Sequence, residues 1–316
     1  PCVFVSLNKG SGAPFFLRKK SMTFDELGLH PAVLKALADA GYTEPTPVQQ
    51  LAIPVALEGR DLMVSSQTGS GKTAAFMLPA IHRFASAVPA ANQERPSARA
   101  RGERPRFTAA RPKMLVLTPT RELAMQVTTA SDKYGLHLRR LRTVSILGGM
   151  PYPKQLELLA RNPEILVATP GRLIDHLRSG KIRFDELEIL VLDEADRMLD
   201  MGFIEDIETI IAATPATRQT LLFSATLDGQ VGTMAARITR DAKVISIAGS
   251  TTKHEHIEQR VHFVDDLAHK NRLLDHLLRD ASLHQAVVFT ATKRDADIIA
   301  DRLAEDGFAA AALHGD

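Results

Sequence analysis

The stretch Ser66-Gln67-Thr68-Gly69-Ser70-Gly71-Lys72-Thr73 follows an apolar run and precedes a helical pattern. Glycines at positions 69 and 71 allow backbone N–H groups to curl around phosphate oxygens, and the start of the next helix adds its positive dipole end. Lys72 would neutralise the β- and γ-phosphates of a nucleotide, and Thr73 would ligate Mg²⁺. The first position departs from the general pattern, since Ser66 stands where glycine is usual. The alternative, an ordinary glycine-rich turn, does not explain the Gly-Lys-Thr ending.

A second group of chemically active residues is the acidic run in Val191-Leu192-Asp193-Glu194-Ala195-Asp196. By itself this run equally suits a solvated helix start, because carboxylates favour first turns. It follows an apolar strand, however, and open α/β sheets place their active crevice at the carboxyl ends of strands. Together with the upstream loop, it predicts that Asp193 holds Mg²⁺ through water and that Glu194 orients and polarises the water that attacks the γ-phosphate. Lys72, Asp193 and Glu194 are the predicted catalytic residues.

Short apolar runs that alternate with helical patterns must position these residues. Such alternation, with strands apolar on both faces, predicts an α/β fold with a parallel sheet covered by helices on both sides. The predicted strands are 61–65, 114–118, 143–147, 165–168, 189–192 and 220–223, and the predicted helices are 72–84, 121–133, 153–160 and 172–178.

Composition divides the chain into three parts. Residues 1–22 are predicted to be a disordered leader or extension, with a basic RNA-contacting arm as the alternative. Residues 23–245 form the first domain, interrupted by an Arg-rich insertion at about 86–112 that is read as a mobile surface loop, with an auxiliary basic patch as the alternative. Residues 246–316 form a smaller, incomplete second domain, with strands at 259–264, 286–290 and 309–313 and helices at 268–279 and 293–305.

The overall composition excludes several classes of protein. The 316 residues are 45% hydrophobic and 24% charged, which rules out wholesale disorder. No apolar run reaches the roughly 18 residues of a membrane span. The single cysteine, Cys2, excludes an internal disulfide and fits a reducing cytosol. A net charge of +2 is too weak to imply a nucleic-acid partner, so such a partner must be argued from local motifs.

With these motifs the chain resembles the DEAD-box RNA helicases, from about Phe24 to its last residue. Gly41 to Gln49, with Phe24 upstream, is similar to the adenine-reading Q motif of that family. Three further stretches match its RNA-backbone motifs, and Ser224-Ala225-Thr226 matches the motif that couples ATP to RNA. The RNA-backbone positions are Pro119, Thr120, Arg121, Gly148, Gly149, Thr169, Pro170, Gly171 and Arg172.

The resemblance implies a RecA-like first domain, a truncated second RecA-like domain, ATP and Mg²⁺ as cofactors, and RNA as a partner bound through its backbone. All eight residues from Ser66 to Thr73 would bind the nucleotide. Gln49, with one donor and one acceptor, would read adenine N6 and N7. Tyr42 or Phe24 would stack on the base or, equally, fill the core.

Ser224 and Thr226 would hydrogen-bond Asp196 and relay the nucleotide state to RNA, with capping of the next helix as the alternative. The sequence as a whole most resembles the bacterial RhlE-type subgroup of this family. A cytoplasmic location is expected.

Two rival functions stay open. The first is a P-loop ATPase that acts on DNA, and the second is a fragment that binds ATP or RNA without turnover. The family's arginine fingers lie in later motifs, and none of the 316 residues matches them, so hydrolysis by this chain alone is expected to be slow.

Overall fold

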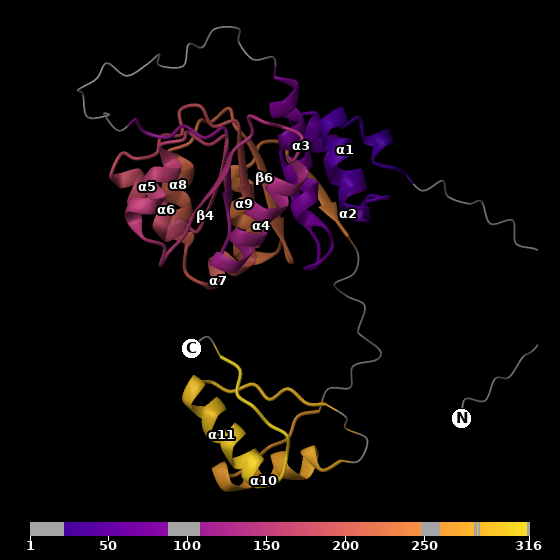
Figure 1. Ribbon diagram of the computed structural model, residues 1–316, viewed down its shortest axis with the longest axis vertical. Coiled ribbons are helices and arrows are strands. Elements are labelled where there is room, and N and C mark those ends of the chain that lie inside the picture. The colour runs from indigo at the N-terminus through magenta and orange to yellow at the C-terminus, as the bar shows by residue number, and fades with distance from the viewer. Residues whose placement is uncertain (1–21, 88–107, 248–259, 281–282, 284, 315–316) are drawn as a thin grey trace, which may run out of the picture. The chain divides into compact units, whose positions relative to one another are not determined.

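The computed structural model describes residues 22–87, 108–247, 260–280, 283 and 285–314 (Figure 1). The chain divides into two compact units, Pro1–Thr252 and Lys253–Asp316. The predicted leader, apart from Met22, and most of the predicted insertion lie outside the described residues. Among the described residues, no helix is both long and apolar enough to cross a membrane.

The first unit is built on a seven-stranded sheet in the order β3-β4-β2-β5-β6-β1-β7. Every neighbouring pair of strands is parallel. The strands are β1 (Leu62–Ser65), β2 (Met114–Leu117), β3 (Thr143–Ile146), β4 (Ile165–Ala168), β5 (Ile189–Leu192), β6 (Gln219–Ser224) and β7 (Lys243–Ser246). The six strands predicted for this unit are therefore confirmed to within one residue at each end, and β7 is additional.

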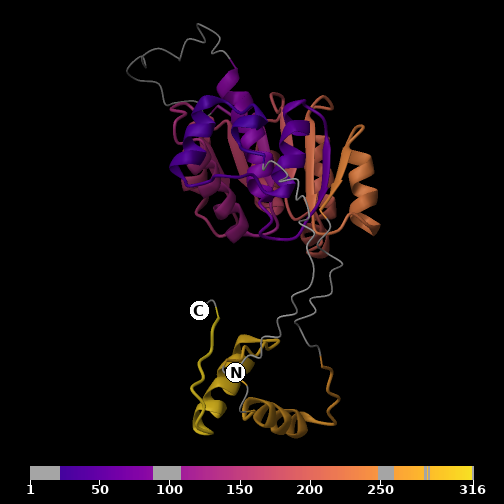
Figure 2. The ribbon, with the colours of Figure 1, turned by 90° about the vertical axis from the view of Figure 1, so that its right-hand side faces the viewer.

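Helices cover both faces of this sheet, as the apolar strands predict (Figures 1 and 2). One layer contains α1 (Pro31–Asp39), α2 (Pro47–Leu57), α3 (Lys72–Ser86) and α4 (Arg121–Tyr134), after a short 3-10 helix, η1 (Asp25–Leu27). The other contains α5 (Tyr152–Leu159), α6 (Pro170–Arg178), α7 (Ala195–Asp200), α8 (Ile204–Ala212) and α9 (Gly229–Ile238).

Alternation along each strand divides the core between the two layers. In β5, Ile189 and Val191 pack with the layer of α1 to α4, whereas Leu190 and Leu192 pack with the layer of α5 to α9. Successive side chains of a strand point to opposite faces, so a strand that is apolar at every position needs a helical layer on each side. The α/β class with helices on both faces is thus confirmed.

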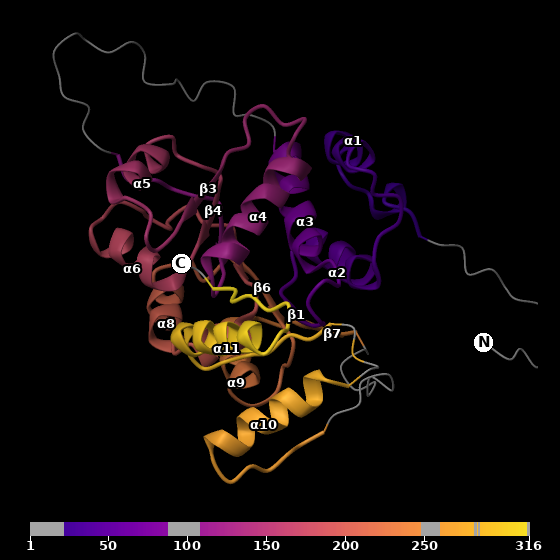
Figure 3. The same cartoon turned by 60° about the horizontal axis from the view of Figure 1, so that its bottom comes forward.

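The second unit contains α10 (Leu267–Leu278) and α11 (Lys293–Glu305), close to the helices predicted there (Figure 3). The three strands predicted for this unit are wrong for its described residues, which form no strand; Gln259 lies outside them. Phe263, Phe289 and Leu313, which lie in the predicted strands, are 91%, 93% and 96% exposed. A segment becomes a strand only when a neighbour supplies ladder hydrogen bonds, and the described residues of this unit pair with none.

Candidate functional site

The loop between β1 and α3 contains the predicted phosphate-binding residues. Gly69 and Gly71 have φ of 77° and 94°, a left-handed conformation that strains other residues. The hydroxyl of Ser70 donates to Oγ of Ser66 at 3.1 Å. The side chain of Lys72 is buried and its Nζ donates to the carbonyl oxygen of Ser66 at 3.1 Å. The ammonium group therefore lies inside the loop, at the start of α3.

Gln49 joins the start of α2 to this loop. Its Oε1 accepts from the N–H of Thr46 at 3.0 Å, and its Nε2 donates to the carbonyl oxygen of Gly71 at 3.1 Å. A Cβ at position 71 would collide with Nε2 of Gln49, so glycine is required there by close approach as well as by φ. Oε1 and Nε2 of Gln49, the two groups expected to read adenine, therefore both have protein partners. Gln49 would have to exchange these bonds in order to read a base.

The two aromatic candidates for base stacking lie in different environments. Phe24 is 5% exposed and belongs to the core beneath α1 to α4. Tyr42 is 40% exposed, and its ring lies 6.0 Å from that of Tyr134, with Nζ of Lys133 at 4.9 Å from its centroid. Phe24 thus fills the core, and Tyr42 packs against the end of α4.

The acidic residues follow β5 directly. Asp193 is 2% exposed, and its Oδ1 is buried without a hydrogen-bond partner among the described residues. Burial raises the pKa of Asp193 to about 6, nearby Lys72 lowers it, and Glu194 raises it. Glu194 has φ of 53°, a left-handed conformation that costs a non-glycine residue about 1 kcal/mol or more. A buried carboxylate oxygen with no partner among the described residues fits a hydrated cation. Thr73, the other predicted Mg²⁺ ligand, is the second residue of α3, directly after Lys72.

The loop after β6 connects the acidic residues that follow β5 with the end of β1, which leads into the phosphate-binding loop. The N–H of Ala225 donates to Oδ2 of Asp196 at 3.2 Å, and the carbonyl oxygen of Ala225 accepts from the hydroxyl of Ser65 at 2.9 Å. The expectation that Ser224 and Thr226 provide the bonds to Asp196 differs from this structure. Oγ of Ser224 is buried without a described partner, and Thr226 is exposed. A backbone N–H makes the contact because the strand ends at Ser224 and turns its next peptide toward α7.

Ala225 and Ser65 were not among the predicted site residues. Nothing in the sequence distinguishes a backbone donor from its neighbours, and Ser65 is only the last residue of a predicted strand. Their position becomes evident only once β1 and β6 are paired, with Ser65 opposite Ser224.

The predicted RNA-contacting residues gather at the ends of the neighbouring strands β2, β4 and β3. Thr120 caps α4, because its Oγ1 accepts from the N–H of Leu123 at 3.3 Å. Gly149 has φ of 75°, and a Cβ there would lie 2.6 Å from Nη1 of Arg121. Nη1 of Arg172 donates to the carbonyl oxygen of Met150 at 3.3 Å. The loops after β2 and β3 and the start of α6 therefore meet, with two guanidinium groups among them.

The remaining predicted residues of this set occupy the same three loops. Pro119 is buried just before Thr120, and Gly148 is half-buried beside Gly149. The N–H of Thr169 donates to the carbonyl oxygen of Ile146 at 3.3 Å, and Pro170 and Gly171 form the first turn of α6. Within the phosphate-binding loop, Gln67 and Thr68 are exposed.

The strand order divides the site into two adjoining halves. The phosphate-binding loop, the Ser224 loop and the acidic run follow β1, β6 and β5, which are neighbours in the sheet. The predicted RNA-contacting loops follow β2, β4 and β3, which are the next neighbours beyond β5. All six ends lie at the same edge, because the strands are parallel.

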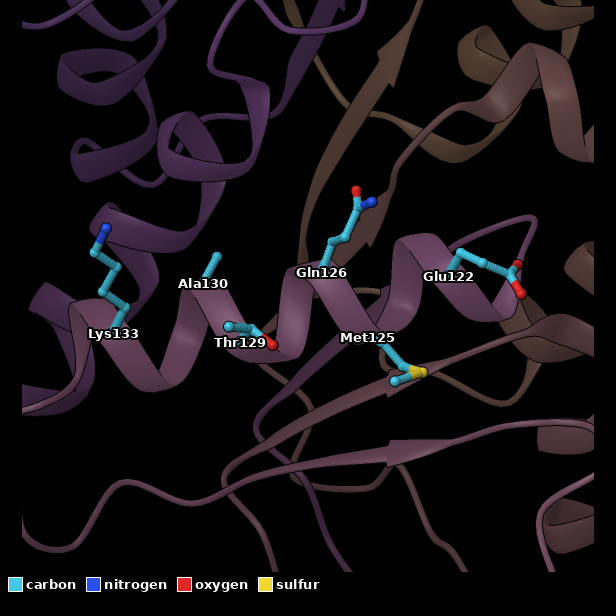
Figure 4. A pocket seen from close by; sticks show the side chains of 6 residues that line it. All are labelled: Glu122, Met125, Gln126, Thr129, Ala130 and Lys133. Carbon is cyan, nitrogen blue, oxygen red and sulfur yellow. The ribbon is translucent and has the colours of Figure 1, made fainter. Parts of the chain in front are cut away.

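A shallow apolar pocket lies elsewhere, along α4 (Figure 4). The labelled side chains all come from this one helix: Glu122, Met125, Gln126, Thr129, Ala130 and Lys133. None of the predicted nucleotide-binding residues lines it. In the phosphate-binding loop itself, Lys72 bonds to Ser66 and Gln49 bonds to Gly71.

Comparison with known proteins gives a consistent result. Residues 46–234 match the family model for DEAD/DEAH box helicases. The chain is 40% identical over 294 residues to the "DEAD-box ATP-dependent RNA helicase RhpA" of Helicobacter pylori, covering 93% of this chain and 55% of that protein. It is also 40% identical over 294 residues to the "ATP-dependent RNA helicase DeaD" of Escherichia coli, covering 93% of this chain and 43% of that protein.

A solved structure is similar as well. A DEAD box protein from the hyperthermophile Methanococcus jannaschii matches with a TM-score of 0.61 and 33% identity, covering 93% of this chain and 73% of that one. The chain spans about half the length of the curated relatives it matches.

Proposed function

Since the chain belongs to the DEAD/DEAH box helicase family, we propose that it provides the ATP-binding and RNA-binding apparatus of an ATP-dependent RNA helicase. The reaction would be Mg-ATP hydrolysis coupled to local unwinding or remodelling of RNA duplexes. The proposal includes the RhlE-type subgroup, from the general run of the sequence, and a cytoplasmic location, where RNA substrates and a reducing environment occur together.

The nucleotide half would hold ATP through residues of β1, β6 and β5. Lys72 would exchange its bond to the Ser66 carbonyl for phosphate oxygens, because an ammonium group binds an anion more strongly than a neutral carbonyl. Bound Mg²⁺ would neutralise charge on the β- and γ-phosphates, held by Thr73 and, through water, by Asp193. The unpartnered Oδ1 of Asp193 supports this assignment. Glu194 would accept a hydrogen bond from the attacking water and so orient it.

The RNA half would contact phosphates and sugars rather than bases. Arg121 and Arg172 supply guanidinium donors, and the loop at Gly149 brings backbone close to the first of them. Contacts of this type fix a strand in place without reading its sequence. RNA would be distinguished from DNA through its 2′-OH groups and its A-form shape.

The loop after β6 would transmit the nucleotide state. Ala225 bonds to Asp196, three residues after Asp193, and through Ser65 to the strand that leads into the phosphate-binding loop. A shift of either the loop or the acidic run on ATP binding would therefore move the backbone of Ala225. The roles of Ser224 and Thr226 in this coupling are part of the proposal.

One observation carries the proposal, namely that the two halves adjoin along a single sheet edge. β5, whose end bears Asp193 and Glu194, is hydrogen-bonded directly to β2, whose end leads to Thr120 and Arg121. Because β5 and β2 are neighbours in one sheet, ATP and RNA would bind at neighbouring positions on one rigid frame.

The test is selectivity of binding by the chain. A short fluorescein-labelled oligouridylate is bound in the presence of Mg²⁺ and a non-hydrolysable ATP analogue, and unlabelled RNA or DNA of matching sequence competes. We expect RNA to displace the probe at much lower concentration than DNA, and ATP to bind more tightly than GTP. Equal displacement by DNA would favour the DNA-directed ATPase instead.

A further inference from the structure

Gln155 is a polar side chain of α5 with no exposed surface, and it contacts the loop between β3 and α5. Its Nε2 donates to the carbonyl oxygen of Leu147 at 3.3 Å and to that of Met150 at 2.8 Å. These two carbonyls bracket Gly148 and Gly149. One buried carboxamide therefore closes the loop that presents both glycines.

His176 of α6 fixes the other end of this carboxamide. It is also fully buried, and its Nε2 lies 3.1 Å from Oε1 of Gln155. Both amide hydrogens of Gln155 already face carbonyl oxygens, so Oε1 must accept and Nε2 of His176 must carry a hydrogen. Burial lowers the pKa of His176, and Arg172 lowers it further against the opposing effect of Asp175. Nδ1 is buried with no hydrogen-bond partner among the described residues, which fits a neutral ring with its hydrogen on Nε2.

A stacked tyrosine holds the plane of the histidine ring. Tyr152 lies face to face with His176, with ring centroids 4.5 Å apart and planes within 2°. The phenol oxygen of Tyr152 lies 3.0 Å from Oγ of Ser179, whose own hydrogen is donated to the carbonyl oxygen of Asp175 at 2.8 Å. The phenol thus donates, and the stack is anchored to the end of α6. The orientation of Gln155 is determined by both helices.

We propose that Gln155, oriented by His176, is a positioning residue for RNA-backbone binding. Its carboxamide holds the turn at Gly148–Met150 in the shape that sets Gly149 against Arg121, and Gln155 itself contacts no RNA. Nη1 of Arg172 bonds to the same Met150 carbonyl as Gln155 does, so this carbonyl joins the loop to α5 and α6 together. The inference rests on the proposed function of that loop.

The chain offers a matched control at the other edge of the sheet. Gln219, at the start of β6, is 5% exposed and donates through Nε2 to the carbonyl oxygens of Ala56 at 3.0 Å and Arg60 at 2.7 Å. Its Oε1 accepts from Nη2 of Arg83 at 2.7 Å. Gln219 thus makes the same pattern of bonds as Gln155, yet it lies at the end of the sheet far from every strand end that bears a predicted site residue.

The experiment compares Gln155→Met with Gln219→Met, since methionine keeps the length of glutamine and removes both donors. RNA affinity is measured by anisotropy of the labelled oligouridylate, and ATP affinity by calorimetry. We expect Gln155→Met to weaken RNA binding about tenfold with ATP affinity unchanged, because the loop loses its preorganised shape. Gln219→Met should alter neither affinity. Equal loss of RNA affinity in the two variants, or none in Gln155→Met, would overturn the proposal.

A second measurement separates this inference from the proposed function. NMR order parameters of the Gly148 and Gly149 amides should fall in Gln155→Met from about 0.85 toward 0.6, and stay high in Gln219→Met. If the unsubstituted chain does not bind RNA, the proposed function fails. The order parameters then still decide whether Gln155 positions the loop, and unchanged values would refute that role.

Substitution of His176 provides an independent variant. His176→Gln keeps an N–H near the position of Nε2, whereas His176→Leu removes the donor. We expect His176→Gln to retain most of the RNA affinity and His176→Leu to reproduce the loss seen in Gln155→Met. Equal affinities for the two His176 variants would contradict the orienting role of the imidazole.

Discussion

The buried carboxylate of Asp193 should make the stability of the protein fall as pH rises, and Asp193→Asn should remove that dependence. Burial raises the pKa of this group from 3.8 to about 6. Between these values the native state binds more protons than the unfolded state, so the free energy of unfolding decreases with increasing pH. The complete shift corresponds to about 3 kcal/mol.

Urea unfolding at a series of pH values measures this effect. Between about pH 4 and pH 7 the difference in unfolding free energy between Asp193→Asn and the unsubstituted chain should grow by about 2 kcal/mol in favour of the variant. The figure is smaller than 3 kcal/mol because the unfolded carboxyl is already about half ionised at pH 4. Carboxylates elsewhere titrate in both proteins and cancel in the difference.

Lys72→Met provides a companion variant with a predicted direction. Lys72 lowers the pKa of Asp193, so its removal should raise that pKa further and extend the fall in stability to higher pH. Parallel stability curves for Asp193→Asn and the unsubstituted chain would refute the reasoning that burial dominates at Asp193. A Lys72→Met stability curve that falls at lower pH than that of the unsubstituted chain would also refute it.

Lys72→Met and two further variants test the two halves of the site. Lys72→Met should reduce Mg-ATP affinity at least tenfold by calorimetry, because the phosphates lose the cation within the loop; unchanged affinity would exclude the phosphate-binding assignment. Gln49→Ala should weaken ATP binding and narrow the preference for ATP over GTP, and a preserved preference would show that adenine is read elsewhere. Gly149→Ala should cost about 1 kcal/mol of stability from its φ of 75° and displace Arg121. Its RNA affinity should fall about tenfold with ATP affinity unchanged, whereas equal loss of both would indicate general misfolding.

Much of the first unit could be predicted because its central strands β2, β4 and β5 are apolar at every position. Runs such as Ile165–Ala168 and Ile189–Leu192 are short, rich in branched residues and flanked by polar residues. The structure has a strand at each of them. Their order in the sheet could not be predicted, because it depends on crossovers rather than on local pattern. That order brings the two halves of the site together.

The remaining differences between prediction and structure arise where tertiary contacts determine the secondary structure or the partner of a side chain. Helices α1, α2 and α7 to α9 were not predicted, since α7 has only six residues and α2 contains Pro54. The sequence predicts that the carboxamide of Gln49 reads adenine, but the same donor and acceptor also match the N–H of Thr46 and the carbonyl of Gly71. Nothing in the sequence identifies Gln155, because its two acceptors are backbone oxygens that any residue would supply.

Single-turnover hydrolysis of ATP by the chain in excess over nucleotide tests the central claim most directly. The rate is measured with Mg²⁺, with and without single-stranded RNA, for the unsubstituted chain and for Glu194→Gln. Because no described or predicted residue supplies an arginine finger, the account predicts slow hydrolysis with almost no stimulation by RNA, which Glu194→Gln abolishes while ATP affinity is retained. Equal rates for the two proteins in the presence of RNA would contradict the assignment of Glu194, and with it the proposed ATP-dependent helicase mechanism.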